Sequence, residues 1–285
     1  MSRRRQLAGW LLLLAPLAYL CIFLVVPLAL LLVTSLHPYS ATHGVGPGWT
    51  LENYRAFLTS RFDLGVLFET LKISLVTTLC CLVLGYPVAF YLSQSSGRRR
   101  RVITLLLLSP LLVSMVIRAY GWVIVLGSTG PIAGLFRALG LHAPVMLYNE
   151  FAVVLGMVHV LLAYMVIAIS ASLDAIDVGV VRAARNLGAS PWQAFRRVVL
   201  PLSAPGVLAG SVIVFSITSS SFVTPAILGG SRVKLMSYLT YDNVTSVLNW
   251  PFGSAIGFIL IAVTTGILLL YGTLARRGAP EAIFQ

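Results

Sequence analysis

Residues 151–173 read FAVVLGMVHVLLAYMVIAISASL, a stretch without a single charged side chain. A helix needs about 20 apolar residues to cross the hydrocarbon core of a bilayer, and this stretch is long enough. Inside lipid there is no water to bond the backbone, so a crossing segment of this kind is helical. Residues 151–173 therefore predict a transmembrane helix.

Five further stretches have the same apolar character. They are about Trp10–Ser35, Leu67–Leu92, Val102–Leu126, Gly206–Leu228 and Gly253–Ala275. The first follows a basic start, as a signal peptide does, but its apolar run exceeds the 7–15 residues typical of such a signal, and we expect it to be a retained helix. The sequence predicts an all-α integral membrane protein with six transmembrane helices in one domain, residues 1–285.

The overall composition agrees with a membrane protein. Hydrophobic residues make up 58% of the chain and charged residues 10%, whereas soluble domains carry roughly 25% charged residues. This composition excludes a soluble enzyme and a disordered chain. The three cysteines lie inside apolar runs and make no disulfide framework.

The net charge of +12 has an uneven distribution along the chain. Basic clusters lie between the apolar stretches and do not gather into one basic surface of a folded domain, which argues against nucleic-acid binding. Most of the basic residues lie before the first span, after the second, after the fourth and after the sixth: Arg3, Arg4, Arg5, Arg98, Arg99, Arg100, Arg101, Arg182, Arg185, Arg196, Arg197, Arg276 and Arg277. Because cytoplasmic loops carry such an excess, both termini are predicted to be cytoplasmic.

The long loop between the fourth and fifth spans, residues 174–201, has helix signals of its own. Asp177 can cap a helix that Gly188 ends. Ser190 and Pro191 then restart a second helix that reaches the membrane at Pro201. We expect a helix–turn–helix on the cytoplasmic face. Its edge of small and apolar residues, Ala183, Ala184 and Leu187, would let another protein approach closely.

The spacing within this loop resembles the "EAA" loop of binding-protein-dependent ABC importer permeases. Arg182-Ala183-Ala184 is followed after three residues by Gly188, and after nine more by Val198-Val199-Leu200-Pro201. Arginine stands at 182 where the family usually has glutamate, and valine stands at 198 for isoleucine. The resemblance implies a type I ABC importer permease fold. It also implies a loop that couples to an ATPase through Arg182, Ala183, Ala184, Arg185, Leu187, Gly188, Leu200 and Pro201.

Other segments resemble the spermidine/putrescine-type branch of these permeases: Glu52–Tyr54, Pro110–Leu112, Ile117–Trp122, Gly130–Ile132, Phe222–Gly230 and Asn249–Ala255. The resemblance implies import of a small organic solute, such as spermidine or putrescine, across a bacterial inner membrane. An amino-acid derivative or a phosphonate stays open as the solute. The implied partners are a second permease subunit (a related chain or a second copy), two ATP-binding subunits and an extracytoplasmic solute-binding protein. ATP would be hydrolysed by the partner, so this chain would be no enzyme and hold no cofactor.

Two features within the spans suggest a translocation path. An arginine at mid-membrane costs about 2.5–3.5 kcal/mol on insertion scales, so Arg118 is expected to face a cavity, to pair with an acid, or to reach the outer headgroups. The fifth span carries a polar band, which favours a wet cavity over helix packing. The candidate path residues are Arg118, Tyr120, Thr218, Ser219, Ser220, Ser221 and Phe222. Outside this path, Glu69 and Lys72 are expected to pair.

Two rival classes of function have less support. An ion-coupled secondary transporter would be expected to show paired broken helices and buried carboxylates, and no Asp or Glu lies deep in a predicted span. A membrane-embedded enzyme would need a nucleophile–base pair, a metal cluster or a phosphate-binding loop, and the sequence has no such motif.

Overall fold

The structure is a computed structural model that describes residues 14, 16 and 18–278. The basic cluster Arg3–Arg5 and the first residues of the predicted first span lie outside the described residues. The chain divides into two compact units, one formed by residues 1–64 with 239–261 and the other by residues 65–238 with 262–285. Each unit is described by itself.

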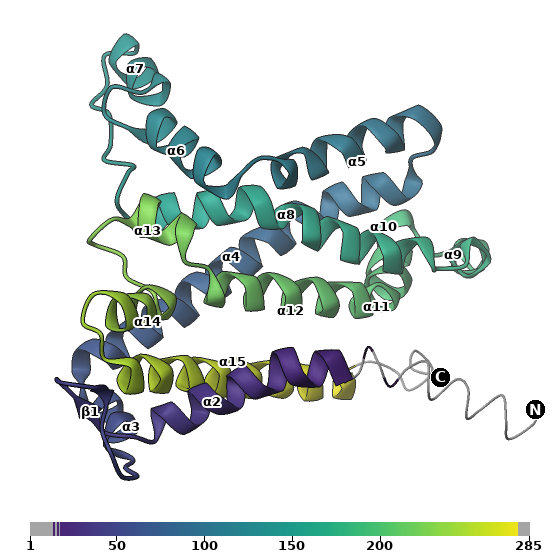
Figure 1. The fold of residues 1–285 in the computed structure, drawn as a ribbon. Coiled ribbons are helices and arrows are strands. Elements are labelled where there is room, and N and C mark those ends of the chain that lie inside the picture. The colour runs from purple at the N-terminus through teal and green to yellow at the C-terminus, as the bar shows by residue number, and fades with distance from the viewer. Residues whose placement is uncertain (1–13, 15, 17, 279–285) are drawn as a thin grey trace, which may run out of the picture. The chain divides into compact units, whose positions relative to one another are not determined.

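The chain is helical almost throughout, with one short hairpin (Figure 1). In order, the elements are the π-helix η1 (Cys21–Val25), α2 (Val26–Ser35), β1 (Tyr39–Ser40), β2 (Gly44–Val45), α3 (Glu52–Thr59), α4 (Arg61–Gln94), α5 (Gly97–Leu112), α6 (Met115–Leu126), α7 (Pro131–Ala138), α8 (Glu150–Asp174), α9 (Val178–Asn186), α10 (Pro191–Ala194), the π-helix η2 (Phe195–Val199), α11 (Leu200–Leu202), α12 (Ala204–Ser220), α13 (Val223–Gly229), α14 (Met236–Thr245) and α15 (Trp250–Gly278).

The prediction of an all-α protein with about six spans is confirmed. Five helical stretches among the described residues are long and apolar enough to cross a membrane: Ala18–Ser35, Arg61–Gln94, Met115–Ala138, Glu150–Asp174 and Trp250–Thr273. A sixth arises when Pro191–Leu202 and Ala204–Ser220, which meet at a 57° bend, are taken together.

Two predicted spans are not the continuous helices that we expected. The helix predicted over Val102–Leu126 ends at Leu112, where Val113 and Ser114 are non-helical, and resumes as α6. The helix predicted over Gly206–Leu228 ends at Ser220, is extended at Ser221, and resumes as α13. Pro225 explains the second break, because the ring of a proline clashes with the carbonyl four residues earlier in a continuous helix.

Buried polar contacts in the first unit hold α3 against the end of α2. The buried side-chain amide of Asn53 donates to the carbonyls of Ser35 and His37, each at 2.8 Å. The hydroxyls of Tyr54 and Ser35 lie 2.7 Å apart. At the start of α3, Leu51 takes the N-cap position, and the Thr50 hydroxyl accepts from the Glu52 amide.

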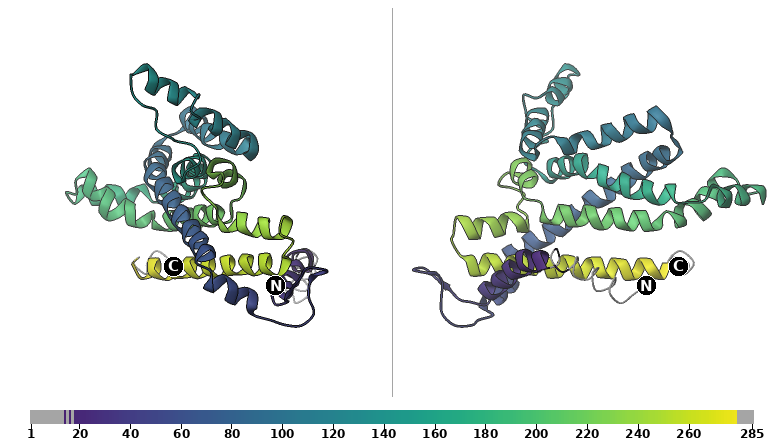
Figure 2. Two further views of the ribbon diagram at one scale, coloured as in Figure 1. Left: turned by 90° about the vertical axis from the view of Figure 1, so that its left-hand side faces the viewer. Right: turned by 45° about the vertical axis from the view of Figure 1, so that its right-hand side comes forward.

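The core of the second unit is organised around α8, which lies alongside α12 in every view (Figures 1 and 2). Two glycines four residues apart, Gly206 and Gly210, let these helices approach closely. A Cβ at Gly206 would lie 2.6 Å from the carbonyl oxygen of Ala168, and one at Gly210 would lie 2.7 Å from the sulfur of Met165. Small residues at such positions favour close helix packing in membranes.

Replacing Gly206 by alanine is expected to destabilise the protein by about 1–3 kcal/mol, because the added methyl group overpacks this contact. Thermal unfolding of the purified chain measures the change. Gly266→Ala is the matched control, since a Cβ there meets nothing within 4 Å. Equal melting temperatures for the two variants would contradict the close packing of α8 on α12.

Candidate functional site

The predicted cytoplasmic helix–turn–helix is present, and its first helix, α9, is capped at both ends. The Asp177 carboxylate accepts from the amide of Gly179 at 2.7 Å. At the other end the amides of Gly188 and Ala189 donate to the carbonyls of Arg185 and Ala184. Gly188 has φ +89°, the left-handed conformation that ends many helices and favours glycine.

The second helix of the loop starts at the residue that the sequence predicts and ends within one residue of the predicted Pro201. Ser190 and Gln193 form a capping box, with the Ser190 hydroxyl accepting from the Gln193 amide and the Gln193 side chain accepting from the Ser190 amide. The helix runs through α10, the π-helix η2 and α11 as far as Leu202. Its bend onto α12 follows at Ser203.

The outward side of α9 is exposed and largely apolar. None of its residues is buried, and the Leu187 side chain that follows is 90% exposed. Val180, Ala183, Ala184 and Leu187 recur at the three- and four-residue spacing of one helix face. We call these four residues the α9 edge. An apolar strip on a loop facing water indicates a surface for a partner.

The eight predicted coupling residues fall into two groups. Six lie on α9 or directly after it: Arg182, Ala183, Ala184, Arg185, Leu187 and Gly188. Leu200 and Pro201 lie in α11, just before the bend. Among the described residues the ion pairs join Lys72 to Glu69, Lys72 to Glu150, and Arg100 to Asp174, so the exposed Arg182 is in none of them.

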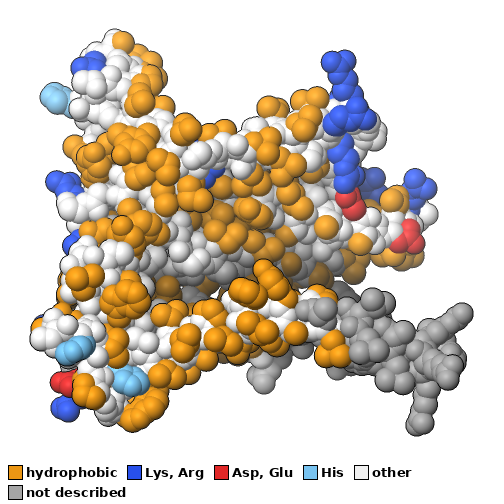
Figure 3. Space-filling view, viewed as in Figure 1, with side chains coloured by type: hydrophobic (Ala, Val, Ile, Leu, Met, Phe, Trp, Pro, Cys, Tyr) orange, Lys and Arg blue, Asp and Glu red, His pale blue; other side chains and the backbone are white. Residues whose placement is uncertain are grey.

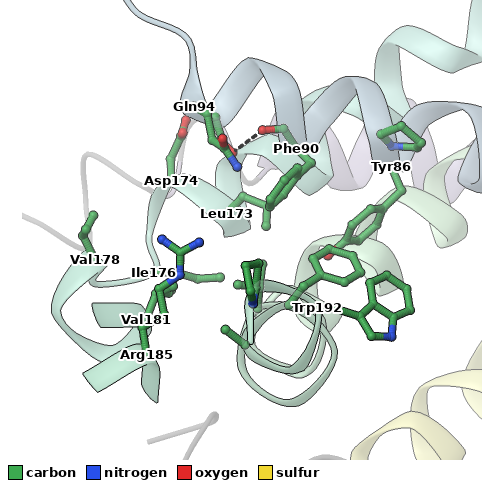
Figure 4. Close-up of a pocket in the computed structure, with 16 residues that line it drawn as sticks. Tyr86, Phe90, Gln94, Leu173, Asp174, Ile176, Val178, Val181, Arg185 and Trp192 are labelled. Carbon is green, nitrogen blue, oxygen red and sulfur yellow. Dashed lines mark hydrogen bonds between the residues drawn. The ribbon is translucent and has the colours of Figure 1, made fainter. Parts of the chain in front are cut away.

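The inward side of the loop encloses a cavity of about 870 Å³ (Figure 4). Its walls come from the ends of α4 and α8 and from α9, α10 and η2. Phe195 is the centre of an aromatic cluster. Its ring stacks on Trp192 at 5.5 Å and meets the rings of Tyr86 and Phe90 edge-on at 5.8 and 5.5 Å.

Sequence reasoning missed this aromatic cluster. The signal was the spacing of Tyr86 and Phe90 by four and of Trp192 and Phe195 by three, each pair on one helix face. Two polar contacts also connect the loop and the nearby helices. The Tyr86 hydroxyl lies 2.8 Å from that of Ser203 at the bend. Arg100 donates two hydrogen bonds to Asp174, which raise the pKa of Arg100 and tie α5 to the end of α8.

A second cavity, of about 260 Å³, lies where the two broken helices meet. Both breaks contribute to its wall, with Val113 and Met115 from the first and Ser221 and Thr224 from the second. Arg118 also lines it, and the Arg118 guanidinium donates to the carbonyls of Pro110 and Val113. The arginine therefore bonds backbone oxygens that the end of α5 leaves without a helical partner.

The polar band of the fifth span is mostly satisfied within its own helix. The hydroxyls of Thr218, Ser219 and Ser220 donate to carbonyls three or four residues earlier. Thr218 and Ser219 are buried, and the ring of Phe222 stacks on Tyr238. Of the seven candidate path residues, the structure brings Arg118 and Ser221 into one cavity wall. Tyr120, Thr218, Ser219, Ser220 and Phe222 are not part of that wall.

The predicted pairing of Glu69 with Lys72 is confirmed, and it has a third member. The Lys72 ammonium lies 2.8 Å from Glu69 and 2.7 Å from Glu150, the first residue of α8. This bridge joins the start of α8 to α4.

The chain matches the family of binding-protein-dependent transport system inner membrane components over residues 11–278. It belongs to this family. The chain is therefore a multi-pass inner-membrane permease component of an ABC importer, a membrane subunit and not an enzyme. Membership in this family excludes the two rival hypotheses, an ion-coupled secondary transporter and a membrane-embedded enzyme.

Related permeases are similar over nearly the whole chain. The spermidine/putrescine transport system permease protein PotB of Escherichia coli (strain K12) is 32% identical over 90% of this chain and 94% of that protein. PotB of Haemophilus influenzae (strain ATCC 51907 / DSM 11121 / KW20 / Rd) is 31% identical over 89% of each chain. The similarity to the spermidine/putrescine-type branch is confirmed.

The fold of the permease is also that of a solved ABC importer. A chain of the bacterial ABC transporter involved in the import of the acidic polysaccharide alginate matches with a TM-score of 0.81 at 19% identity, over 97% of this chain and 98% of that one. A chain of the MetNI methionine ABC transporter matches with a TM-score of 0.58 at 17% identity, over 77% and 99%.

Replacing Arg118 of the permease by methionine is expected to lower its stability by about 1–3 kcal/mol, because the carbonyl oxygens of Pro110 and Val113 lose a donor that lipid does not replace. Thermal unfolding of the purified permease measures the loss. The control is Arg137→Met, since Arg137 donates to the carbonyl of Ala133 one turn earlier in its own helix. An Arg118→Met protein as stable as this control would show that the guanidinium does not support the helix break.

Proposed function

We propose that this permease imports a polyamine such as spermidine or putrescine, delivered by an extracytoplasmic binding protein. The support is the 31–32% identity to two PotB permeases over about nine-tenths of the chain. A solute with a carboxylate is the second candidate, and Arg118 in the wall of the 260 Å³ cavity favours it. A guanidinium binds carboxylates well and repels an ammonium group.

The proposed assembly contains a second permease, two ATP-binding subunits and the binding protein. Solved relatives by fold include the alginate transporter in complex with a pentasaccharide-bound periplasmic protein. The permease itself would hold no cofactor, because ATP would bind to the partner subunits. The whole of residues 1–285 would act as one permease domain, with residues 174–201 as its contact with the ATPase.

The main support for coupling between the ATPase and the membrane helices is the geometry of α9. The helix is capped at both ends, has no buried residue, and presents the α9 edge to a partner. Closure of the ATPase dimer would push on α9. Because the loop leads from α8 through a bend into α12, the push would reach both helices and switch the pathway between its outward and inward states.

Replacing Leu187 by glutamate is expected to reduce ATPase association strongly, because a charge would have to be desolvated at the contact. Folding is expected to be unaffected, since the Leu187 side chain is 90% exposed in the free chain. Co-purification of the ATPase with the tagged permease measures association, and membrane content measures insertion. Normal association of the Leu187→Glu permease would contradict the proposed contact.

A second variant tests the shape of α9 independently of its surface. Gly188→Val is expected to reduce ATP-driven uptake several-fold, because a β-branched residue at φ +89° costs about 1–2 kcal/mol and distorts the end of α9. Gly140→Val is the matched control. At the end of α7, the amides of Gly140 and Leu141 donate the same two kinds of hydrogen bond as those of Gly188 and Ala189. Gly140 has φ +71°, and like Gly188 it has nothing within 4 Å of an added Cβ.

Equal effects of the Gly188→Val and Gly140→Val substitutions on uptake would contradict a coupling role for α9. Loss of membrane insertion in the Gly188 variant alone would assign the glycine to folding instead.

The solute is tested by uptake of labelled spermidine in cells that lack this permease and in cells that regain it. Uptake is expected only in the second, and unlabelled putrescine is expected to compete. Competition by an amino-acid derivative but not by putrescine would favour the second candidate. Equal spermidine uptake in both cells would overturn the polyamine proposal.

A further inference from the structure

The 870 Å³ cavity behind α9 is deep, with an apolar inner part and a basic mouth, and the proposed coupling role does not explain these features. It begins at the cytoplasmic ends of two spanning helices, near Gln94 of α4 and Asp174 of α8. It reaches back along α4 to Tyr86, which at 1.5 Å per residue is about 12 Å toward the middle of the membrane. An occupant of this cavity therefore lies partly at headgroup level and partly at acyl-chain level.

The deep part of the cavity is apolar. Pro87, Phe90, Val199 and the ring of Phe195 form its wall, and the hydroxyl of Tyr86 at its far end is already engaged with Ser203. Water in such a space would find few partners for hydrogen bonds. The deep part therefore suits a hydrocarbon chain better than a polar ligand.

The mouth of the cavity is positively charged. Arg185 lines it, and Figure 4 shows the Arg185 guanidinium on the same side of the cavity as Asp174. Among the described residues that line the cavity, Asp174 is the one acid, and its carboxylate is already bound by Arg100. Arg98, Arg99 and Arg101, near the start of α5, are exposed. Lysine and arginine side chains gather at this end of the visible face (Figure 3).

We propose that this cavity binds an anionic phospholipid of the inner leaflet. The headgroup phosphate lies at Arg185, and one acyl chain runs along Phe90 and Phe195. The apolar depth excludes free inorganic phosphate as the occupant, and the unbalanced arginine at the mouth selects an anionic lipid over a zwitterionic one. A lipid seated here fills the space between α9 and α4 and so supports the position of the coupling helix.

The test uses the whole transport complex, isolated through a tag on this permease and placed in equimolar phosphatidylglycerol and phosphatidylcholine. Native mass spectrometry counts the lipids that stay bound. The wild-type permease is expected to retain phosphatidylglycerol preferentially. Arg185→Gln is expected to lower that preference about fivefold, the effect of one basic residue near a charged membrane surface.

Two further variants separate the cavity from general surface charge. Arg182→Gln is the matched control, because Arg182 lies on the same helix but does not line the cavity, and its preference for phosphatidylglycerol is expected to be that of the wild type. Val181→Phe narrows the cavity with an added ring while keeping Arg185, and is expected to weaken lipid retention.

Equal losses in the Arg185 and Arg182 variants would overturn the proposal in favour of unspecific attraction to the membrane. Undiminished retention of lipid by Val181→Phe, or equal retention of the two lipids by the wild type, would also overturn it. Displacement of phosphatidylglycerol by millimolar inorganic phosphate would show a phosphate site without an acyl-chain pocket. None of these outcomes depends on which solute the permease carries.

Discussion

The contact between α8 and α12 is the constraint on which the functional parts of the permease depend. Gly206 and Gly210 bring the two backbones so close that a single added methyl group would overlap the other helix. Dispersion forces between closely fitting surfaces, and not the exclusion of water, hold helices together in lipid. The 174–201 loop leaves one member of this pair and returns to the other, so movement of the loop acts on two helices that are already packed together.

Aromatic and hydroxyl contacts fix the loop to the helices it leaves. Phe195 lies among Tyr86, Phe90 and Trp192, and the Tyr86 hydroxyl meets Ser203 where the chain bends by 57°. The π-helix η2 stands between α10 and α11, and such turns are frequent at functional sites. The inward side of the loop is thus anchored while the α9 edge stays free, which is the arrangement that a moving contact with a partner requires.

Local signals were sufficient to predict the ends of α9 and the start of α10, because Asp177, Gly188 and Ser190 act on their immediate neighbours. The helix breaks at Val113 and Ser221 were not predicted. A largely apolar pattern hides the first, whereas the polar residues before Ser221 and the following Pro225 offered a signal for the second. The partner of Arg118 was not predicted either. Its acceptors are backbone carbonyls, which every residue carries and which no sequence pattern marks. The third member of the Lys72 bridge, Glu150, needed the packing of α8 on α4 to be known.

The two broken helices have a consequence for how a passage can be polar inside a membrane. The wall of the 260 Å³ cavity gains its polarity from a guanidinium, hydroxyl groups and backbone atoms near the breaks, and contains no carboxylate and no imidazole. The helix breaks thus supply polar groups to a solute at this wall without a carboxylate among the residues that line it.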